Sequence, residues 1–334
     1  MSHRSRAVAG VIAASLLLGA CAPGTTSVPV SSPTLTASSP PASSPPPTAT
    51  PVPTVGPTID VGILRGEIVF TSGRDGGNTD HIWIVNADGS GLRLFSGAST
   101  WEHWPVISPD GTKVAFSLRR VIGGAEMDEI YLVNIDGSGR TQLTHDEAYD
   151  WLPSWSPDGT RLVFECTRDG LQQLCLINID GTGEIQLTTG PDEHRTPSWS
   201  PDGSTIAFLR QVEQLEGPIY IMDVDGSNQT QLTTAPGDSV PRWSPDGRRI
   251  AFARHDLVAD TAQILLMNAD GSGQLTIAND AAYPAWSPDG TFIAFTRATH
   301  PEFGISVMHA DGSDATPLTT GSDWGEAWGL AAGE

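Results

Sequence analysis

Residues 154–159 read Ser-Trp-Ser-Pro-Asp-Gly, and this stretch decides the fold because the chain repeats it. Ser-Pro-Asp-Gly occurs five times, and successive prolines lie 48, 44, 44 and 43 residues apart. In each copy the proline presets φ at the second position of a tight turn, and the glycine accepts a positive φ. The prolines are Pro109, Pro157, Pro201, Pro245 and Pro288. A tight turn that recurs at this period indicates an array of similar structural units.

The residues on both sides of the turn predict four short strands, A to D, in each unit. Pro-x-Trp precedes the turn, as at 153–155, and marks strand A. An apolar pair and a phenylalanine follow it, as at Phe164, and mark strand B. An apolar run ending at Asp-Gly marks strand C, and Gln-Leu-Thr or its equivalent marks strand D. The strand B phenylalanines are Phe70, Phe116, Phe164, Phe208, Phe252 and Phe295.

Six four-stranded units of about 44 residues predict an all-β fold, a six-bladed β-propeller. The first unit begins at Gly66 and contains strands B, C and D only. Near the C-terminus, Trp328 falls where the strand A tryptophans fall in their repeats. We therefore expect the C-terminal segment to supply the missing strand of blade 1 and to cover its edge.

The two motifs, in phase over residues 66–330, resemble the WD40-like repeats of the TolB type. Typical copies of the two motifs are Ser-Trp-Ser-Pro-Asp-Gly at 154–159 and Met-Asp-Val-Asp-Gly-Ser at 222–227. The resemblance implies a propeller that binds proteins. The TolB family carries an N-terminal α/β domain before its six blades and is soluble in the periplasm, where it contacts Pal and other Tol proteins. This chain has a proline-rich segment in that place, so the resemblance implies the propeller without the partner.

The composition narrows the class of partner. Formal net charge is −21, from 39 acidic and 18 basic residues. Such a chain is repelled by phosphate backbones, so we expect no nucleic acid partner. Three cysteines are too few for a disulfide scaffold or a structural zinc site. No apolar run reaches the roughly 20 residues of a membrane span.

The N-terminus resembles a bacterial lipoprotein signal. Arg4 and Arg6 precede an apolar stretch, and Leu-Gly-Ala-Cys at 18–21 resembles a lipobox. The resemblance implies that Cys21 is acylated after removal of residues 1–20, so that the protein is held at a membrane surface outside the cytoplasm. The alternative is an ordinary signal peptide, cleaved after Ala20 or Ala22.

Residues 21–58 are predicted to be a disordered linker, and residues 59–334 the propeller. Between residues 22 and 58 there is no charge, and 26 of 37 residues are Pro, Ser or Thr. Such a stretch cannot bury a core. We interpret it as a spacer of roughly 35–110 Å; a neutral linker is the alternative.

The loops that lead into strand A vary between repeats, and we expect them to surround one mouth of the central channel. Carboxylates among aromatic residues there predict a site for a cationic or amine-bearing ligand. The alternative is a solvated rim. The candidate binding residues are Glu102, His103, Asp150, Trp151, His194, Arg195, Asp238, Asp323 and Trp324; Ser239, Ala281 and Ala282 complete the ring.

No catalytic, metal or cofactor site is predicted. The Asp-Gly turns place Gly fourth and lack the Glu at position twelve of a calcium-binding EF-hand loop. The histidines show no ligand spacing, and there is no Gly-x-Ser-x-Gly elbow. Cys166 and Cys175, on strands B and C of one blade, are predicted to lie directly opposite each other, either as a disulfide or as two small core residues.

From these features we expect a monomeric, non-catalytic, lipid-anchored propeller that binds a protein or peptide of the cell envelope. A propeller that binds or cleaves envelope polysaccharide is the alternative, because acids and aromatic residues at a mouth also suit sugars.

Overall fold

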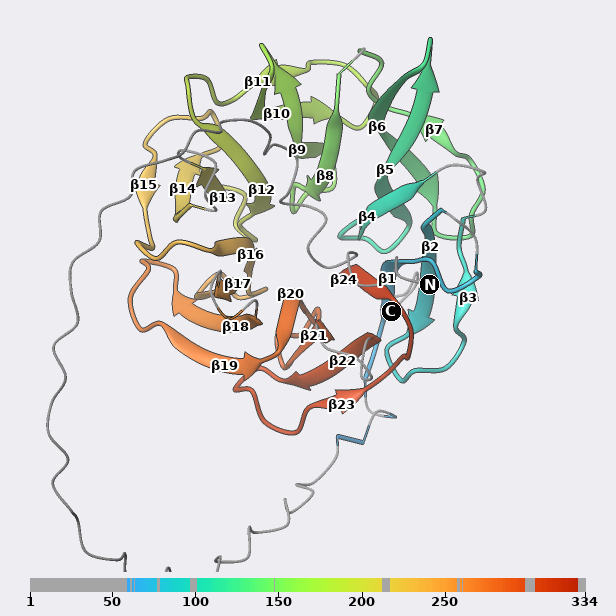
Figure 1. Cartoon of the computed structure of the whole chain (residues 1–334), viewed down its shortest axis with the longest axis vertical. Helices are drawn as coiled ribbons and strands as arrows, with labels where there is room; N and C mark the ends of the chain where they lie inside the picture. Colours follow the sequence, from blue (N-terminus) through green and yellow to red (C-terminus); the bar gives the residue numbers. More distant parts are fainter. Residues whose placement is uncertain are drawn as a thin grey trace, which may run out of the picture. The chain divides into compact units, whose positions relative to one another are not determined.

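The computed structural model describes residues 59–60, 62, 64–76, 79–96, 101–146, 148–211, 217–256, 259, 261–297 and 304–329. The predicted signal peptide, Cys21 and the linker lie outside the described residues. Within them, six four-stranded antiparallel sheets surround a centre, and β4, β8, β12, β16, β20 and β24 lie innermost (Figure 1). The predicted all-β, six-bladed propeller is confirmed.

Blades 2 to 6 each take four consecutive strands. The inner strands, A in the sequence pattern, are β4 (Glu102–Ile107), β8 (Asp150–Trp155), β12 (Glu193–Trp199), β16 (Asp238–Trp243) and β20 (Ala281–Trp286). The B strands are β5 (Lys113–Ile122), β9 (Arg161–Arg168), β13 (Thr205–Gln211), β17 (Arg249–Asp256) and β21 (Phe292–Arg297). The C strands are β6 (Ala125–Asn134), β10 (Leu171–Asn178), β14 (Ile219–Asp223), β18 (Thr261–Asn268) and β22 (Gly304–His309). The D strands, mostly of two residues, are β7 (Thr141–Gln142), β11 (Ile185–Gln186), β15 (Thr230–Gln231), β19 (Leu275–Asn279) and β23 (Thr316–Pro317).

Blade 1 is built from both ends of the propeller. Its strands run in the order β24 (Asp323–Gly329), β1 (Glu67–Ser72), β2 (His81–Asn86) and β3 (Arg93–Leu94). Ile68 pairs with Trp328, and the Trp328 indole donates a hydrogen bond of 2.8 Å to the carbonyl of Arg65. The C-terminal strand therefore closes the ring, as the sequence predicted.

The core lies between the blades. The six repeated phenylalanines are at most 1% exposed. In the cluster shared by blades 2 and 3, Leu132 of β6 packs with Trp155 and Phe164 of blade 3. The Trp155 indole also donates a hydrogen bond of 3.1 Å to the carbonyl of Val106 in blade 2. Tryptophan and phenylalanine recur because each blade must bury one face against its neighbour.

Every inner strand contains a bulge at the residue that precedes the proline of Pro-x-Trp, or at the equivalent residue of β4 and β24. The register shifts there in all six sheets, and that residue has a positive φ of 50–63°. The bulge residues are Trp104, Leu152, Thr196, Val240, Tyr283 and Gly325. A bulge re-aims one side chain relative to its strand. Here the ring centroids of Trp104 in blade 2 and Tyr283 in blade 6 lie 5.6 Å apart, across the inner strand of blade 1.

Glycine at position 325 makes that contact possible. A Cβ on Gly325 would lie 3.1 Å from Cε3 of Trp104, and Trp324 already packs edge-on against Trp104 at 5.0 Å. The inner edge of blade 1 is therefore filled by aromatic rings from blades 1, 2 and 6.

Cys166 and Cys175 are joined by a disulfide, with an S–S distance of 1.99 Å. The sequence predicted that they lie directly opposite each other, and this register is wrong. Cys166 pairs with Gln173, and Cys175 pairs with Phe164. The difference arises from the turn, in which Asp169 and Gly170 both have positive φ and form a two-residue hairpin loop. The cysteines are thus diagonal neighbours on one face of the sheet.

For this pair we expect the peptides that contain Cys166 and Cys175 to remain unlabelled on alkylation under denaturing, non-reducing conditions. After reduction, both residues should be labelled, because the thiols then become available. Two labelled thiols in unreduced, natively exported protein would contradict the disulfide.

Candidate functional site

The structure places most of the predicted mouth residues inside the propeller. They lie within the first three residues of the inner strands. The first residue of each pair lies three positions before the proline of Pro-x-Trp or its equivalent, and all six of these side chains are at most 2% exposed. They are Glu102, Asp150, His194, Asp238, Ala281 and Asp323. In the second positions His103 and Ala282 are buried, whereas Trp151, Arg195, Ser239 and Trp324 are half-buried.

The four buried carboxylates are paired with arginines. Arg254 contacts Asp238 at 2.5 Å, and Arg168 contacts Asp150 at 3.5 Å. The other two pairs are Arg140 with Glu102 and Arg74 with Asp323. Each arginine offsets the cost of burying its acid. These residues therefore do not form the exposed acidic ring that the sequence predicted.

Blade 4 carries a histidine in place of the acid. His194 Nδ1 lies 3.1 Å from Oε1 of Gln173, and burial, followed by the charge of Arg210, lowers the pKa of His194 to about 4. The imidazole is therefore neutral at pH 7 and fits between the blades without a counter-ion.

His103 forms a buried pair with Asp128 of β6. Nε2 of His103 lies 2.9 Å from Oδ1 of Asp128, and Arg119 contacts the other carboxylate oxygen at 3.3 Å. Burial alone would raise the pKa of Asp128, but the hydrogen bond and charge of His103, with the charge of Arg119, outweigh it and lower the pKa. This pair links the inner strand β4 to β6 within blade 2.

A different acid cluster lies between blades 2 and 3. Ligand oxygens of Glu129, Asp146 and Asp150 come within 4.8 Å of one another. Burial, reinforced by the charge of Asp146, raises the pKa of Asp150 to about 8, and burial is also the main cause that raises the pKa of Glu129 to about 7. The cluster was not predicted from the sequence because its members lie on a C strand, a loop and an A strand.

Aromatic side chains reach solvent where the chain enters the inner strands of blades 2 and 3. Trp101 and Tyr149 stand directly before β4 and β8, and their exposed fractions are 38% and 37%. Trp151 packs against Tyr149 with ring centroids 6.1 Å apart, and its indole donates a 3.0 Å hydrogen bond to Gln172. Arg119 lies 5.9 Å from the Trp101 ring. We call Trp101, Tyr149 and Trp151 the aromatic face.

The β5–β6 hairpin extends beside the aromatic face. Its strands are ten residues long, whereas the other B and C strands have five to eight. Val121, near its turn, is 64% exposed. Among the described residues, the β5–β6 hairpin of blade 2 has the longest B and C strands.

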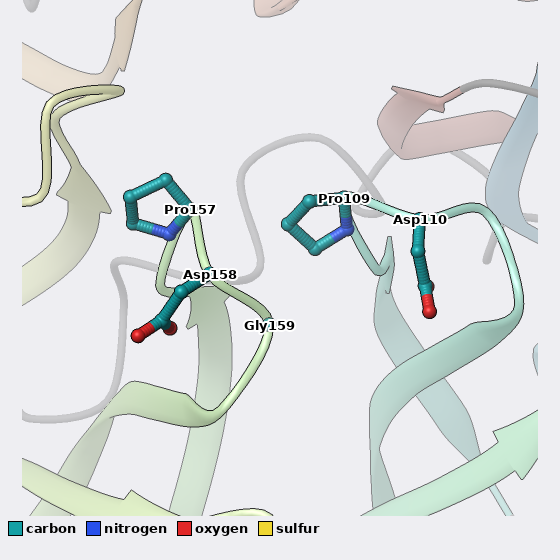
Figure 2. Close-up of a pocket in the computed structure, with 5 residues that line it drawn as sticks. All are labelled: Pro109, Asp110, Pro157, Asp158 and Gly159. Carbon is teal, nitrogen blue, oxygen red and sulfur yellow. The ribbon is translucent and has the colours of Figure 1, made fainter.

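A hollow of about 290 Å³ lies at the opposite ends of the inner strands, between the Ser-Pro-Asp-Gly turns of blades 2 and 3 (Figure 2). Figure 2 shows the Pro109 and Pro157 rings side by side, with both carboxylates directed away from them. Asp158 accepts a 2.6 Å hydrogen bond from Ser156, which lowers its pKa to about 2, and Asp110 is bound in the same way by Ser108. The carboxylates serve their own turns, so the hollow offers little beyond proline surface.

Comparison with known proteins defines the family. The family described as TolB beta propeller domain matches residues 79–216 and 196–328, which together span more than half of the 334 residues. None of the curated proteins compared with the chain matches it. Across the described residues, no helix has the length and hydropathy that a membrane span requires.

Solved structures agree with this fold. TolB from Acinetobacter baumannii aligns with a TM-score of 0.66 at 20% identity, over 80% of this chain and 67% of that one. A putative TolB from Agrobacterium tumefaciens aligns with a TM-score of 0.59 at 22% identity, over 78% and 89%. Hydrazine synthase from Kuenenia stuttgartiensis aligns with a TM-score of 0.64 at 16% identity, over 79% of this chain and 46% of that one. At these identities the similarity is one of fold, and with the family match it shows that the chain belongs to the TolB β-propeller domain family.

Proposed function

We propose that this protein is a lipid-anchored, extracytoplasmic propeller that binds a protein or peptide of the cell envelope through the aromatic face, without catalysing a reaction. The anchor would be Cys21, and the linker would hold the propeller away from the bilayer. The partner surface combines Trp151, a residue selected from the sequence, with Trp101 and Tyr149.

The exposure of the aromatic face is the observation that carries this proposal. The six repeated phenylalanines are buried, whereas Trp101 and Tyr149 leave more than a third of their surface in water at equivalent positions of adjacent blades. Tryptophan and tyrosine dominate the energetics of protein interfaces because they bury a large area at a low cost in side-chain entropy. The protruding β5–β6 hairpin adds a wall beside them.

Crosslinking in intact cells, followed by pull-down of the full-length protein, tests the proposed surface. We expect the double variant Trp101→Ala/Tyr149→Ala to recover at least tenfold less partner, since hot-spot truncations cost about 2 kcal/mol or more. The matched control is Ile185→Ala/Leu275→Ala, because these side chains are 51% and 61% exposed on the outer strands. Equal recovery by both double variants would contradict the proposal.

A glycan ligand remains the alternative for the same surface, because the Tyr149–Trp151 ring pair beside the Gln172 amide also suits sugar stacking. An envelope oligosaccharide that raises the melting temperature of the wild type, and not that of Trp101→Ala/Tyr149→Ala, would replace the protein partner by a glycan.

The anchor has its own test. Cys21→Ala should abolish labelling by a fatty-acid analogue and release the protein from the membrane fraction, because the acylated thioether is then absent. Measurement of the mature N-terminus by mass spectrometry is decisive: an unmodified N-terminus at a residue other than Cys21 would exclude lipid anchoring.

A further inference from the structure

The interface between blades 2 and 3 contains three carboxylates that have no role in the proposed function. Glu129 lies on β6, Asp150 begins β8, and Asp146 comes from the loop that connects the blades. One ligand oxygen from each lies within 4.8 Å of the others. Glu129 and Asp150 are at most 2% exposed, and Asp146 reaches solvent at the edge.

The equivalent interface between blades 3 and 4 shows what the repeat uses when no charge is present. Gln173 and His194 occupy the positions of Glu129 and Asp150. Thr188 donates a 2.9 Å hydrogen bond to Oε1 of Gln173, and His194 Nδ1 lies 3.1 Å from the same oxygen. Neutral groups thus satisfy one another at this interface.

The remaining interfaces contain at most one acid at these two positions. The pairs are His81 with Glu102, Pro218 with Asp238, Gln263 with Ala281, and Gly304 with Asp323. Each of those single acids contacts an arginine. Oε2 of Glu102 and Oδ1 of Asp323 also lack a hydrogen-bond partner, but no second carboxylate faces them at these two positions. In the described part of the chain, therefore, two facing carboxylates and a third from the loop occur between blades 2 and 3 and at no other of the six interfaces.

At this interface one arginine is shared by several acids. Arg168 contacts Asp146 at 2.6 Å and Asp150 at 3.5 Å, but it also contacts Glu184 at 2.5 Å. Oδ2 of Asp150, in a side chain with no exposed surface, has no hydrogen-bond partner, and neither has the buried Oδ1 of Asp146. An unpaired buried carboxylate oxygen is costly unless a proton or a cation neutralises it. A bound cation would take the place of the protons that burial retains on Asp150 and Glu129.

We propose that the blade 2–3 interface binds one calcium ion through carboxylate oxygens of Glu129, Asp146 and Asp150, with water completing the coordination. Ca²⁺–oxygen distances of about 2.3–2.6 Å allow two ligands of one ion to be at most about 5 Å apart, which the 4.8 Å cluster satisfies. All three ligands are hard oxygen donors, which favours Ca²⁺ over Zn²⁺.

A bound ion would join two blades and the loop between them. Glu129 belongs to blade 2, Asp150 to blade 3, and Asp146 lies three residues before Tyr149 of the aromatic face. The ion would therefore fix the loop on which part of the proposed partner surface stands. The site does not depend on that function, because its binding can be measured with calcium alone.

Calorimetric titration of the full-length protein in detergent with CaCl₂, after treatment with a chelator and dialysis, tests the site. We expect one ion per chain, with a dissociation constant near the 10⁻⁴–10⁻³ M range of extracellular modules. Glu129→Gln, which copies the residue of the next interface, should weaken binding at least tenfold. Asp192→Asn is the matched control, because Asp192 is an acid before β12 that already pairs with Arg210.

Thermal unfolding supplies a second measurement on the same samples. Calcium at 10 mM should raise the melting temperature of wild type and Asp192→Asn, and the increase should vanish in Glu129→Gln and in Asp146→Asn. Asp146 is the safer second variant because its side chain is 38% exposed. No saturable binding by the wild type up to 10 mM, or unchanged affinity in folded Glu129→Gln and Asp146→Asn proteins, would overturn the proposal.

Discussion

Removal of residues 323–334 is expected to lower the free energy of unfolding by several kcal/mol, since it takes the inner strand from blade 1. Trp328 is 9% exposed, and truncation of a buried tryptophan alone costs about 3–5 kcal/mol. The deletion also leaves β1 with an unpaired edge and Arg74 without Asp323. Urea denaturation followed by tryptophan fluorescence measures the loss.

The matched control for this deletion removes residues 330–334 only and keeps β24. We expect its denaturation midpoint to equal that of the full chain. If the longer deletion unfolds at the same urea concentration and with the same cooperativity as the control, the ring is closed by other contacts.

Glu165→Gln is expected to make the protein more stable at pH 8–9, by roughly 3 kcal/mol, and to change little near pH 4. Burial raises the pKa of Glu165 to about 7, against opposing effects of Arg195 and of the hydrogen bond that the Thr196 backbone N–H donates. The side chain is therefore protonated in the folded protein between its ordinary pKa of 4.5 and about pH 7, while the unfolded chain has already released the proton. The stability that this proton provides is present below pH 4.5 and is lost as the pH rises through 7.

Denaturation curves at several pH values check this expectation, with Glu126→Gln as the control because Glu126 is 59% exposed on β6. The difference between Glu165→Gln and wild type should grow with pH, whereas Glu126→Gln should follow wild type throughout. A difference that stays constant from pH 4 to 9 would show that folding does not raise the pKa of Glu165.

The fold could be predicted from the sequence because the same local rule operates in every repeat. Ser-Pro-Asp-Gly fixes a turn by backbone geometry, and the phenylalanine and tryptophan that flank it must be buried wherever the turn occurs. The closing strand could be predicted because Trp328 has the sequence context of a strand A, whereas the first unit has strands B, C and D without a strand A.

The site was harder to predict because the direction of a side chain depends on the bulge in the inner strand. The predicted site residues lie three and two positions before the proline of Pro-x-Trp, as Asp150 and Trp151 do before Pro153. The bulge at Leu152 leaves Asp150 between the blades, where Arg168 reaches it from β9. Neither the positive φ nor the long-range partner leaves a signal in a single sequence.

The register of the two cysteines was wrong for a different reason. A loop of four residues would have placed Cys166 opposite Cys175, but Asp169 and Gly170 alone form the turn. Asp-Gly is a strong signal for a two-residue loop, so the sequence did contain the information for this register.

Blade 1 has a consequence for the order of events during biosynthesis, because its inner strand is the last to be made. Arg65 and Trp328, which share a hydrogen bond, are 263 residues apart. At about 5–20 residues per second, β1 exists for roughly 13–50 s before its partner strand leaves the ribosome. Through that interval one edge of β1 can pair with any strand it meets. Chaperone demand should therefore depend on the delay before β24 appears, more than on the stability of the finished ring.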